Sequence, residues 1–245
     1  MAYSHTLQEV KFSLLLQHII GRQNPFYDAD HVRTNDALNN NYNTPQQTDC
    51  LFIPHNNPVE AEAYSFNMQT GRFLEVSDRR KNYMQLNGFE DFIASASRAS
   101  MNITGTEGAN RIITGNNNDY VQGMGGSDRL FGNHGHDTLF GGSGHDYVYG
   151  GTGDDQLAGG SGFDRLYGGQ GADRFRLTSG SGFDRIMDFR DGQDQIEIKA
   201  IDGLDNVTIR DGRGGHARIY NDNDLIAIVY NTQGADLTVQ GEVIV

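Results

Sequence analysis

The stretch GGSGHDYVYGGTGDDQLAGGSGFDRLY, residues 141–167, consists of three copies of one nine-residue unit. In each copy, glycines and an aspartate dominate the first six positions, and an apolar residue stands at the centre of the last three. The unit runs without insertion from Gly105 to Arg176. Its sixth position carries Asn110, Asp119, Asp128, Asp137, Asp146, Asp155, Asp164 and Asp173. A fixed period of this kind predicts a solenoid, in which each unit packs only on its neighbours.

Each unit divides into a turn followed by a short strand. Glycine permits the positive φ angles of a tight turn, and aspartate side chains hydrogen-bond the nearby backbone. In a three-residue strand the central side chain points to one side and its neighbours to the other. The predicted core therefore consists of Ile112, Val121, Leu130, Leu139, Val148, Leu157, Leu166 and Phe175. Two successive units complete one coil, so units n and n+2 lie side by side, about 4.8 Å apart.

Stacking the units also stacks their aspartates. Two carboxylates at this spacing repel each other by about 1 kcal/mol in water, and several times more strongly in less polar surroundings. A hard cation that prefers oxygen ligands would remove the repulsion and contribute free energy of folding. Calcium fits better than magnesium, because it accepts about six to eight oxygens in loose geometry. The alternative is a metal-free region of loops rich in Gly and Asp, against which the regular register argues.

The repeat resembles that of the RTX (repeat-in-toxin) proteins over about residues 102–200. Its closing segment, from Ala172 to Ile198, is similar to those of alginate epimerase R modules and serralysin C-terminal domains. The resemblance implies a parallel β-roll that folds on meeting external calcium and is secreted by a type I apparatus. It also implies that each ion lies between units n and n+2, held by both aspartates and by turn carbonyls of both units.

Carried onto this chain, the resemblance implies four calcium sites. The first set of ligands is Asn133, Gly135, Asp137, Gly150, Thr152 and Asp155. The second set is Gly142, Gly144, Asp146, Gly159, Ser161 and Asp164. The third set is Gly151, Gly153, Asp155, Gly168, Gln170 and Asp173. The fourth set is Met124, Gly126, Asp128, Gly141, Ser143 and Asp146.

The ends of the repeat depart from this pattern. Asp119 is a further expected ligand in an early unit. The early units, however, replace consensus residues with Thr106, Asn110, Thr114 and Asn117, and carry Met124 where glycine is usual. We therefore expect the first one or two sites to be weak or empty. In the closing segment, the candidate ligands or turn residues are Asp184, Asp188 and Asp194.

Composition divides the 245-residue chain into three segments: residues 1–100, 101–200 and 201–245. Only three of the 32 glycines, but all four prolines, precede residue 101. The net charge of −13 argues against nucleic acid as a partner. The single cysteine, Cys50, excludes an internal disulfide, and no apolar run is long enough for a membrane span. The N-terminal stretch contains no convincing signal peptide, which agrees with type I export to the extracellular medium.

The predicted fold is mainly β: the roll, preceded by a small α+β or partly irregular segment and followed by capping strands. Apolar residues at helical spacing predict a helix at Thr6–Ile20, and an apolar face predicts another at Asp78–Ser97. Asn24–Pro58 is polar and predicted to be irregular, with at most one short helix near His31–Leu38. Val59–Phe66 and Arg72–Val76 flank a turn and predict a hairpin. The capping strands are expected at Val207–Arg210, Ala217–Tyr220 and Leu225–Tyr230. The apolar ending Glu242–Val245 is compatible with a type I secretion signal.

One outward face of the roll carries an arginine row beside an aromatic row. The face consists of Arg111, Arg129, Phe131, Tyr147, Tyr149, Arg165 and Tyr167. Guanidinium groups bind carboxylates and ring faces pack on sugars, so this face suits an acidic polysaccharide or another cell-surface component. The alternative is that it packs on the N-terminal segment or forms only cross-strand pairs.

The sequence predicts a secreted calcium-binding protein with a structural, adhesive or polysaccharide-binding role. A different class remains open: a small secreted hydrolase, lyase or epimerase-associated enzyme whose activity resides in residues 1–100. Cys50, His55 and His31 would be the thiol and base of such an enzyme, although they are more simply incidental. The sequence contains no H-E-x-x-H and no G-x-S-x-G motif, which weakens the zinc protease and lipase readings.

Overall fold

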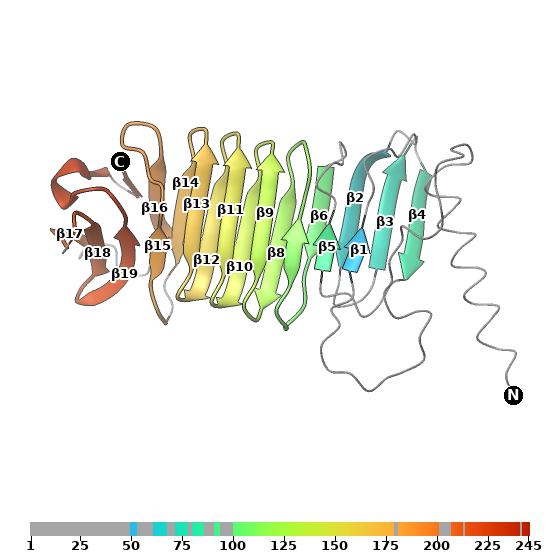
Figure 1. The fold of residues 1–245 in the computed structure, drawn as a ribbon, viewed down its shortest axis with the longest axis horizontal. Helices are drawn as coiled ribbons and strands as arrows, with labels where there is room; N and C mark the ends of the chain where they lie inside the picture. The colour runs from blue at the N-terminus through green and yellow to red at the C-terminus, as the bar shows by residue number, and fades with distance from the viewer. Residues whose placement is uncertain are drawn as a thin grey trace, which may run out of the picture.

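The structure is a computed structural model that describes residues 50–52, 61–67, 72–77, 80–85, 91–93, 100–178, 181–200, 207–212, 214–240 and 242–245. These residues form an elongated parallel β-solenoid of about six coils, with antiparallel strands at its C-terminal end (Figure 1). Two sheets, of ten and eleven strands, run the length of the solenoid. The predicted mainly β class is confirmed.

Each nine-residue unit contributes one strand, and successive strands alternate between the two sheets. The ten-stranded sheet receives β7 (Arg111–Ile113), β9 (Arg129–His134), β11 (Tyr147–Thr152), β13 (Arg165–Gln170) and β15 (Asp184–Ile186). The eleven-stranded sheet receives β6 (Ser100–Thr104), β8 (Tyr120–Gly125), β10 (Thr138–Gly144), β12 (Gln156–Gly162), β14 (Arg174–Thr178) and β16 (Gln195–Ala200). Parallel pairing joins Leu139 to Leu157 and Val148 to Leu166, which confirms that two units complete one coil.

The core is a file of apolar side chains between the two sheets. All eight central residues of the repeat, from Ile112 to Phe175, are at most 1% exposed. The same file continues past the repeat through Ile103 on one side and Ile186 and Ile196 on the other. Between β7 and β13 the core is therefore one large apolar side chain wide at each level, and the polar turns lie along its two edges.

The described strands before residue 100 extend both sheets. The predicted hairpin is confirmed by β2 (Ala61–Asn67) and β3 (Arg72–Ser77), which pair antiparallel. β2 also pairs in parallel with β6, and β1 (Cys50–Phe52) pairs with the strand that precedes β7. Strand pairing thus continues across residue 100, where composition predicted a boundary. The helices expected at Thr6–Ile20 and near His31–Leu38 lie outside the described residues.

The helix expected at Asp78–Ser97 is wrong. This segment instead contains β4 (Arg80–Gln85), antiparallel to β3, and β5 (Asp91–Ile93), parallel to β7. Phe92 pairs with Ile112 and is fully buried at the end of the apolar file. Helical spacing of apolar residues is a local signal, and an open sheet edge with a core position to fill overrides it.

The C-terminal strands close both sheets, as predicted. β17 (Val207–Asp211), β18 (Ala217–Asn221) and β19 (Asp224–Val229) form an antiparallel meander whose last strand pairs with β15. After the short 3-10 helix η3 (Gly234–Asp236), β20 (Val239–Gln240) and β21 (Val243–Ile244) follow, and β21 pairs with β16. Terminal units of a solenoid must cover its open end, and this cap does so. No helix among the described residues is long and apolar enough to cross a membrane.

Met124 occupies a turn position that favours glycine. Its φ angle is +82°; Asn133 adopts +71° at the equivalent second position of the next unit, and Asn117 adopts +73° at the fourth position of the preceding unit. Asparagine tolerates this region, whereas a side chain such as methionine is strained there by about 1–2 kcal/mol. The register of the repeat nevertheless passes through Met124 unchanged, because β8 pairs with β10 on both sides of it.

We expect Met124→Gly to stabilise the folded protein by about 1 kcal/mol, because glycine removes the strain at positive φ. Thermal unfolding at saturating calcium measures the change. Gln122→Gly, in the same strand but without positive φ, is the matched control and is expected to destabilise the protein. A lower melting temperature for both variants would contradict the strain at Met124.

Candidate metal sites

The turn carboxylates stack in two columns, one along each edge of the solenoid. The first column comprises Asn110, Asp128, Asp146, Asp164 and Asp184, which precede or begin strands of the ten-stranded sheet. The second column comprises Asp119, Asp137, Asp155, Asp173 and Asp194, which precede strands of the eleven-stranded sheet. All ten residues are buried. The predicted stacking of the aspartates is therefore present.

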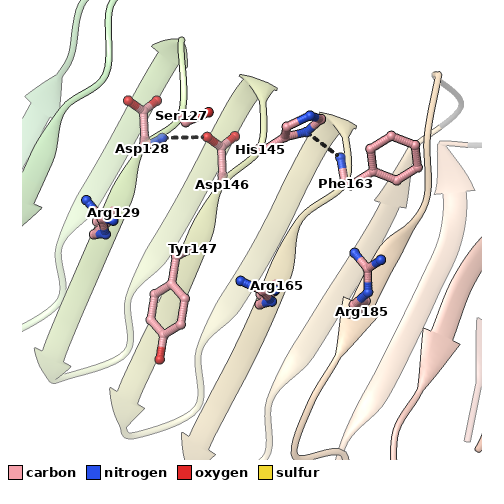
Figure 2. Close-up of a pocket in the computed structure, with 9 residues that line it drawn as sticks. All are labelled: Ser127, Asp128, Arg129, His145, Asp146, Tyr147, Phe163, Arg165 and Arg185. Atoms are coloured by element: carbon pink, nitrogen blue, oxygen red, sulfur yellow. Dashed lines mark hydrogen bonds between the residues drawn. The ribbon is translucent and has the colours of Figure 1, made fainter.

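One oxygen of each carboxylate ties its turn to the preceding coil. Asp137 Oδ1 accepts a hydrogen bond from the backbone N–H of Asp119 at 2.8 Å, and Asp155 Oδ1 does the same for Asp137. In the first column, Asp146 Oδ1 accepts from the N–H of Asp128 at 2.8 Å (Figure 2). The acceptor lies eighteen residues after the donor, so each bond joins two neighbouring coils. The same bond fixes the position of the carboxylate.

The second oxygen of the interior carboxylates is unpaired. The Oδ2 atoms without a hydrogen-bond partner among the described residues are those of Asp128, Asp137, Asp146, Asp155 and Asp164. These atoms are also buried. A buried carboxylate oxygen without a partner is costly and calls for a ligand.

Four of the five unpaired oxygens lie, together with a carbonyl oxygen of the next coil, close against a glycine. A Cβ placed on Gly132 would overlap Asp137 Oδ2 and lie 2.7 Å from the carbonyl oxygen of Gly150. The same arrangement joins Asp155 Oδ2 to Gly168 O beside Gly150. The first column shows the same arrangement at two glycines. Asp128 Oδ2 and Gly141 O meet beside Gly123, and Asp146 Oδ2 and Gly159 O meet beside Gly141. Only a residue without a side chain fits this close to both oxygens.

Burial raises the pKa of the seven repeat aspartates from Asp119 to Asp173 above the usual 3.8. The pKa of Asp137 and that of Asp146 rise to about 6, mainly because burial removes water from the charged form. The pKa of Asp128 rises to about 7 for the same reason, with a further contribution from Asp146. The pKa of Asp155 rises to about 8, since Asp137 and Asp173 add repulsion to the effect of burial. At neutral pH the columns therefore need protons or a bound cation.

The oxygens beside these glycines fit calcium. Among the described residues, no three His, Cys, Asp or Glu side chains are grouped to hold a metal ion. Each candidate metal position offers carboxylates from two coils, so backbone carbonyl oxygens would have to supply the remaining ligands of the ion. Calcium accepts such mixed oxygen ligands in loose geometry and would neutralise the stacked charges.

Comparison with known families agrees with this geometry. A family model of the RTX calcium-binding nonapeptide repeat (4 copies) matches residues 102–126, 113–148 and 149–186. The chain carries RTX calcium-binding repeats. Such repeats imply calcium binding and are typical of secreted proteins. No curated protein matches the chain, and the comparisons give no evidence for the expected similarity to alginate epimerases or serralysins.

The structure brings together part of each RTX ligand set. In the first set, Asp137 Oδ2 and Gly150 O converge beside Gly132, and Asp155 lies directly beside Asp137 in the second column. The carbonyl oxygens of Asn133 and Gly135 face Gly151 and Gly153 of the next coil. In the fourth set, the carbonyls of Met124 and Gly126 face Gly142 and Gly144 in the same way. The carbonyls of Ser143, Thr152, Ser161 and Gln170 remain predicted ligands.

Asp119 differs from the interior carboxylates, because both of its oxygens have partners. Oδ1 accepts from the N–H of Met101 at 2.7 Å, and Oδ2 accepts from the N–H of Gly115 at 3.3 Å. The hydroxyl of Thr114 also hydrogen-bonds this carboxyl. Asp119 thus lacks the unpaired oxygen of the interior positions, in line with the expected weakness of the first sites.

The three closing aspartates take different roles. Asp184 is buried beside Asp164, and burial, together with repulsion from Asp164, raises the pKa of Asp184 well above its usual value. Asp188 accepts the backbone N–H groups of Gly168 at 2.9 Å and Gly169 at 3.0 Å, so it acts as a turn residue. Asp194 extends the second column, since its Oδ1 accepts from the N–H of Asp173 at 3.0 Å.

The structure does not test the thiol and base of the alternative enzyme hypothesis. Cys50 begins β1, whereas His31 and His55 lie outside the described residues. The assignment of an activity to residues 1–100 therefore stays a prediction.

We expect the calcium-free protein to lose stability as the pH rises from about 4 to about 8. In this window the folded carboxylates, with pKa values raised from 3.8 to about 6–8, bind more protons than the unfolded chain. The free energy of unfolding therefore falls with rising pH. Urea unfolding in a chelator at several pH values measures this trend, and a stability that rises with pH would contradict it.

We expect Gly150→Ala to remove calcium from the position between Asp155 and Gly168. The added Cβ would overlap Asp155 Oδ2 and lie 2.7 Å from Gly168 O, so it would crowd both oxygens. The number of bound ions, measured by equilibrium dialysis, should fall by about one. Gly108→Ala is the matched control, because the nearest atom to its Cβ is 3.7 Å away. Equal calcium binding by both variants would argue against this position.

Proposed function

We propose that this chain is a secreted adhesive protein whose roll folds on binding calcium and whose ten-stranded sheet binds an acidic polysaccharide. Two structural features support the proposal: the columns of unpaired carboxylate oxygens, and a row of arginines on one sheet face. The first provides the calcium-dependent fold, and the second provides the binding surface.

The calcium switch follows from the columns. Without an ion, the stacked and buried carboxylates either repel one another or take up protons at neutral pH. With calcium, the same groups bridge neighbouring coils and so stabilise the whole solenoid. Inside a cell, where free calcium is scarce, the chain would stay unfolded and exportable; outside, it would fold.

The arginine row is the observation that carries the binding proposal. Arg111, Arg129, Tyr147, Arg165 and Arg185 occupy the same register position on β7, β9, β11, β13 and β15. Figure 2 shows the last four on successive strands. Neighbouring positions in such a row are about 4.8 Å apart. A linear polymer with regularly spaced carboxylates suits this periodic arrangement of guanidinium groups.

An aromatic row runs beside the arginines. Phe131, Tyr149 and Tyr167 share the next outward register position, and Tyr147 packs on both ends of this row. The ring centroids of Tyr147 and Tyr167 are 5.0 Å apart, and those of Phe131 and Tyr147 are 5.8 Å apart. The rings therefore form the cross-strand pairs that were the alternative interpretation. They remain half-buried rather than buried, so sugar rings still have access to them.

A groove of about 480 Å³ follows the arginine row. Its lining includes Arg129, Arg165, His145 and Phe163, together with the first-column carboxylates Asp128 and Asp146 (Figure 2). Ionised carboxylates would repel an anionic ligand, and the chain as a whole has a net charge of −13. Calcium bound to the first column would cancel this repulsion, so we expect ligand binding to require calcium.

We expect the triple variant Arg129→Ala, Arg165→Ala, Tyr149→Ala to lose retention on an alginate gel in the presence of calcium. The loss should be at least about tenfold in apparent affinity, because two charge-assisted contacts and one ring contact are removed. The matched control is Arg174→Ala, Arg176→Ala, Tyr120→Ala, which removes the same side chains from the eleven-stranded sheet. Circular dichroism with calcium verifies that both variants fold. Unchanged retention of the first variant, or an equal loss in both, would refute the proposed face.

A further inference from the structure

The two ends of the second column differ from its interior. Oδ2 is unpaired at Asp137 and Asp155, but not at Asp119, which precedes them, or at Asp173, which follows. In each case a polar side chain of the same protein lies next to the carboxylate.

Thr114 fills the N-terminal position. It stands where later coils have Gly132 and Gly150, each close against a carboxylate oxygen and a carbonyl oxygen. Its hydroxyl lies 3.0 Å from the carbonyl oxygen of Gly132 and hydrogen-bonds the carboxyl of Asp119. These two groups correspond to the carbonyl and carboxylate that converge at the interior positions. The threonine hydroxyl therefore lies within reach of both groups, and its single proton serves one of them at a time.

Arg190 fills the C-terminal position. Its Nη2 donates to the carbonyl oxygen of Gly171 at 2.7 Å and lies 3.4 Å from Asp173 Oδ2. Its Nε lies 3.6 Å from Asp194 Oδ2. The guanidinium thus contacts a turn carbonyl and the carboxylates of two neighbouring coils, the same kinds of oxygen that surround an interior position. Both carboxylate side chains are at most 1% exposed.

We propose that calcium occupies only the interior of the second column, and that the Thr114 hydroxyl and the Arg190 guanidinium hold its two terminal positions in place of ions. The inference rests on calcium binding by the repeats, as proposed above. A guanidinium attached to the chain is present at any calcium concentration, so the last coil of this column is held together without an ion. The first column ends differently: Asp184 Oδ1 is buried without a hydrogen-bond partner among the described residues and is left for a ligand.

Calcium stoichiometry tests both ends. Equilibrium dialysis of the full chain should show about one additional bound ion for Arg190→Ala, and likewise for Thr114→Gly, because each change exposes a set of oxygens equivalent to an interior position. Thr114→Ser, which keeps the hydroxyl, and Arg176→Ala, which removes an exposed arginine from β14, are the controls and should bind as the wild type does. Unchanged stoichiometry in both test variants would overturn the inference.

Hydrogen exchange in a chelator tests the charge at the C-terminal end. The backbone N–H of Asp173 donates to Asp194 Oδ1, and that of Arg174 donates to Asp155 O. Arg190→Lys keeps a cation there, whereas Arg190→Met fills similar space without charge. We expect the lysine variant to keep the protection of these two amides and the methionine variant to lose it, on the order of tenfold.

Equal protection in the lysine and methionine variants would overturn the role of Arg190 as a resident cation. This comparison needs no bound calcium, so it remains decisive if Arg190→Ala fails to fold. A wild-type chain that bound no calcium would refute the proposed function itself. A wild-type chain that bound calcium, with stoichiometry unaltered by either end substitution, would refute only the present inference.

Discussion

The structure depends on rows of buried carboxylates, and in the interior of each row only one of the two carboxylate oxygens has a hydrogen-bond partner among the described residues. One oxygen of Asp137 or Asp146 accepts a backbone N–H from the neighbouring coil, and this bond fixes the spacing and the register of the turns. The other oxygen has no partner among the described residues. The bond that builds the solenoid therefore also brings together the charges that destabilise it. A cation that binds oxygen would resolve this conflict, and its binding free energy would add to the stability of the fold.

The same geometry explains the thin core. Each coil buries one apolar side chain per sheet, such as Leu139 opposite Val148, and the turns bury aspartates rather than further apolar groups. In most domains, stability comes from a large apolar core. Here part of the stability has to come from the turns along the two edges of the solenoid. Because the edge contribution depends on ions and protons, stability becomes a property of the surroundings as well as of the sequence.

The repeat itself could be predicted in detail from the sequence, because a strict period places each residue by its position in the unit. The core position of Leu157 and the turn position of Asp155 follow from that period alone. The strands of Arg80–Gln85 and Asp91–Ile93 could not be predicted this way, since the vacant sheet edges that recruit them are set by residues distant in the sequence. Arg190 was missed for a similar reason. A three-residue insertion separates its turn from the regular spacing, and only the folded coil brings the guanidinium to Asp173.

The C-terminal strands make the cap depend on the last coil of the solenoid. Val243 and Ile244 form β21, which pairs with β16, and Ile244 is fully buried. β16 in turn pairs with β14, and the carboxylate of Asp194, which directly precedes β16, accepts the backbone N–H of Asp173. The cap therefore has a sheet edge to join only when the carboxylate column holds the last coil in register, so the same interaction that stacks the repeats also orders the C-terminal end.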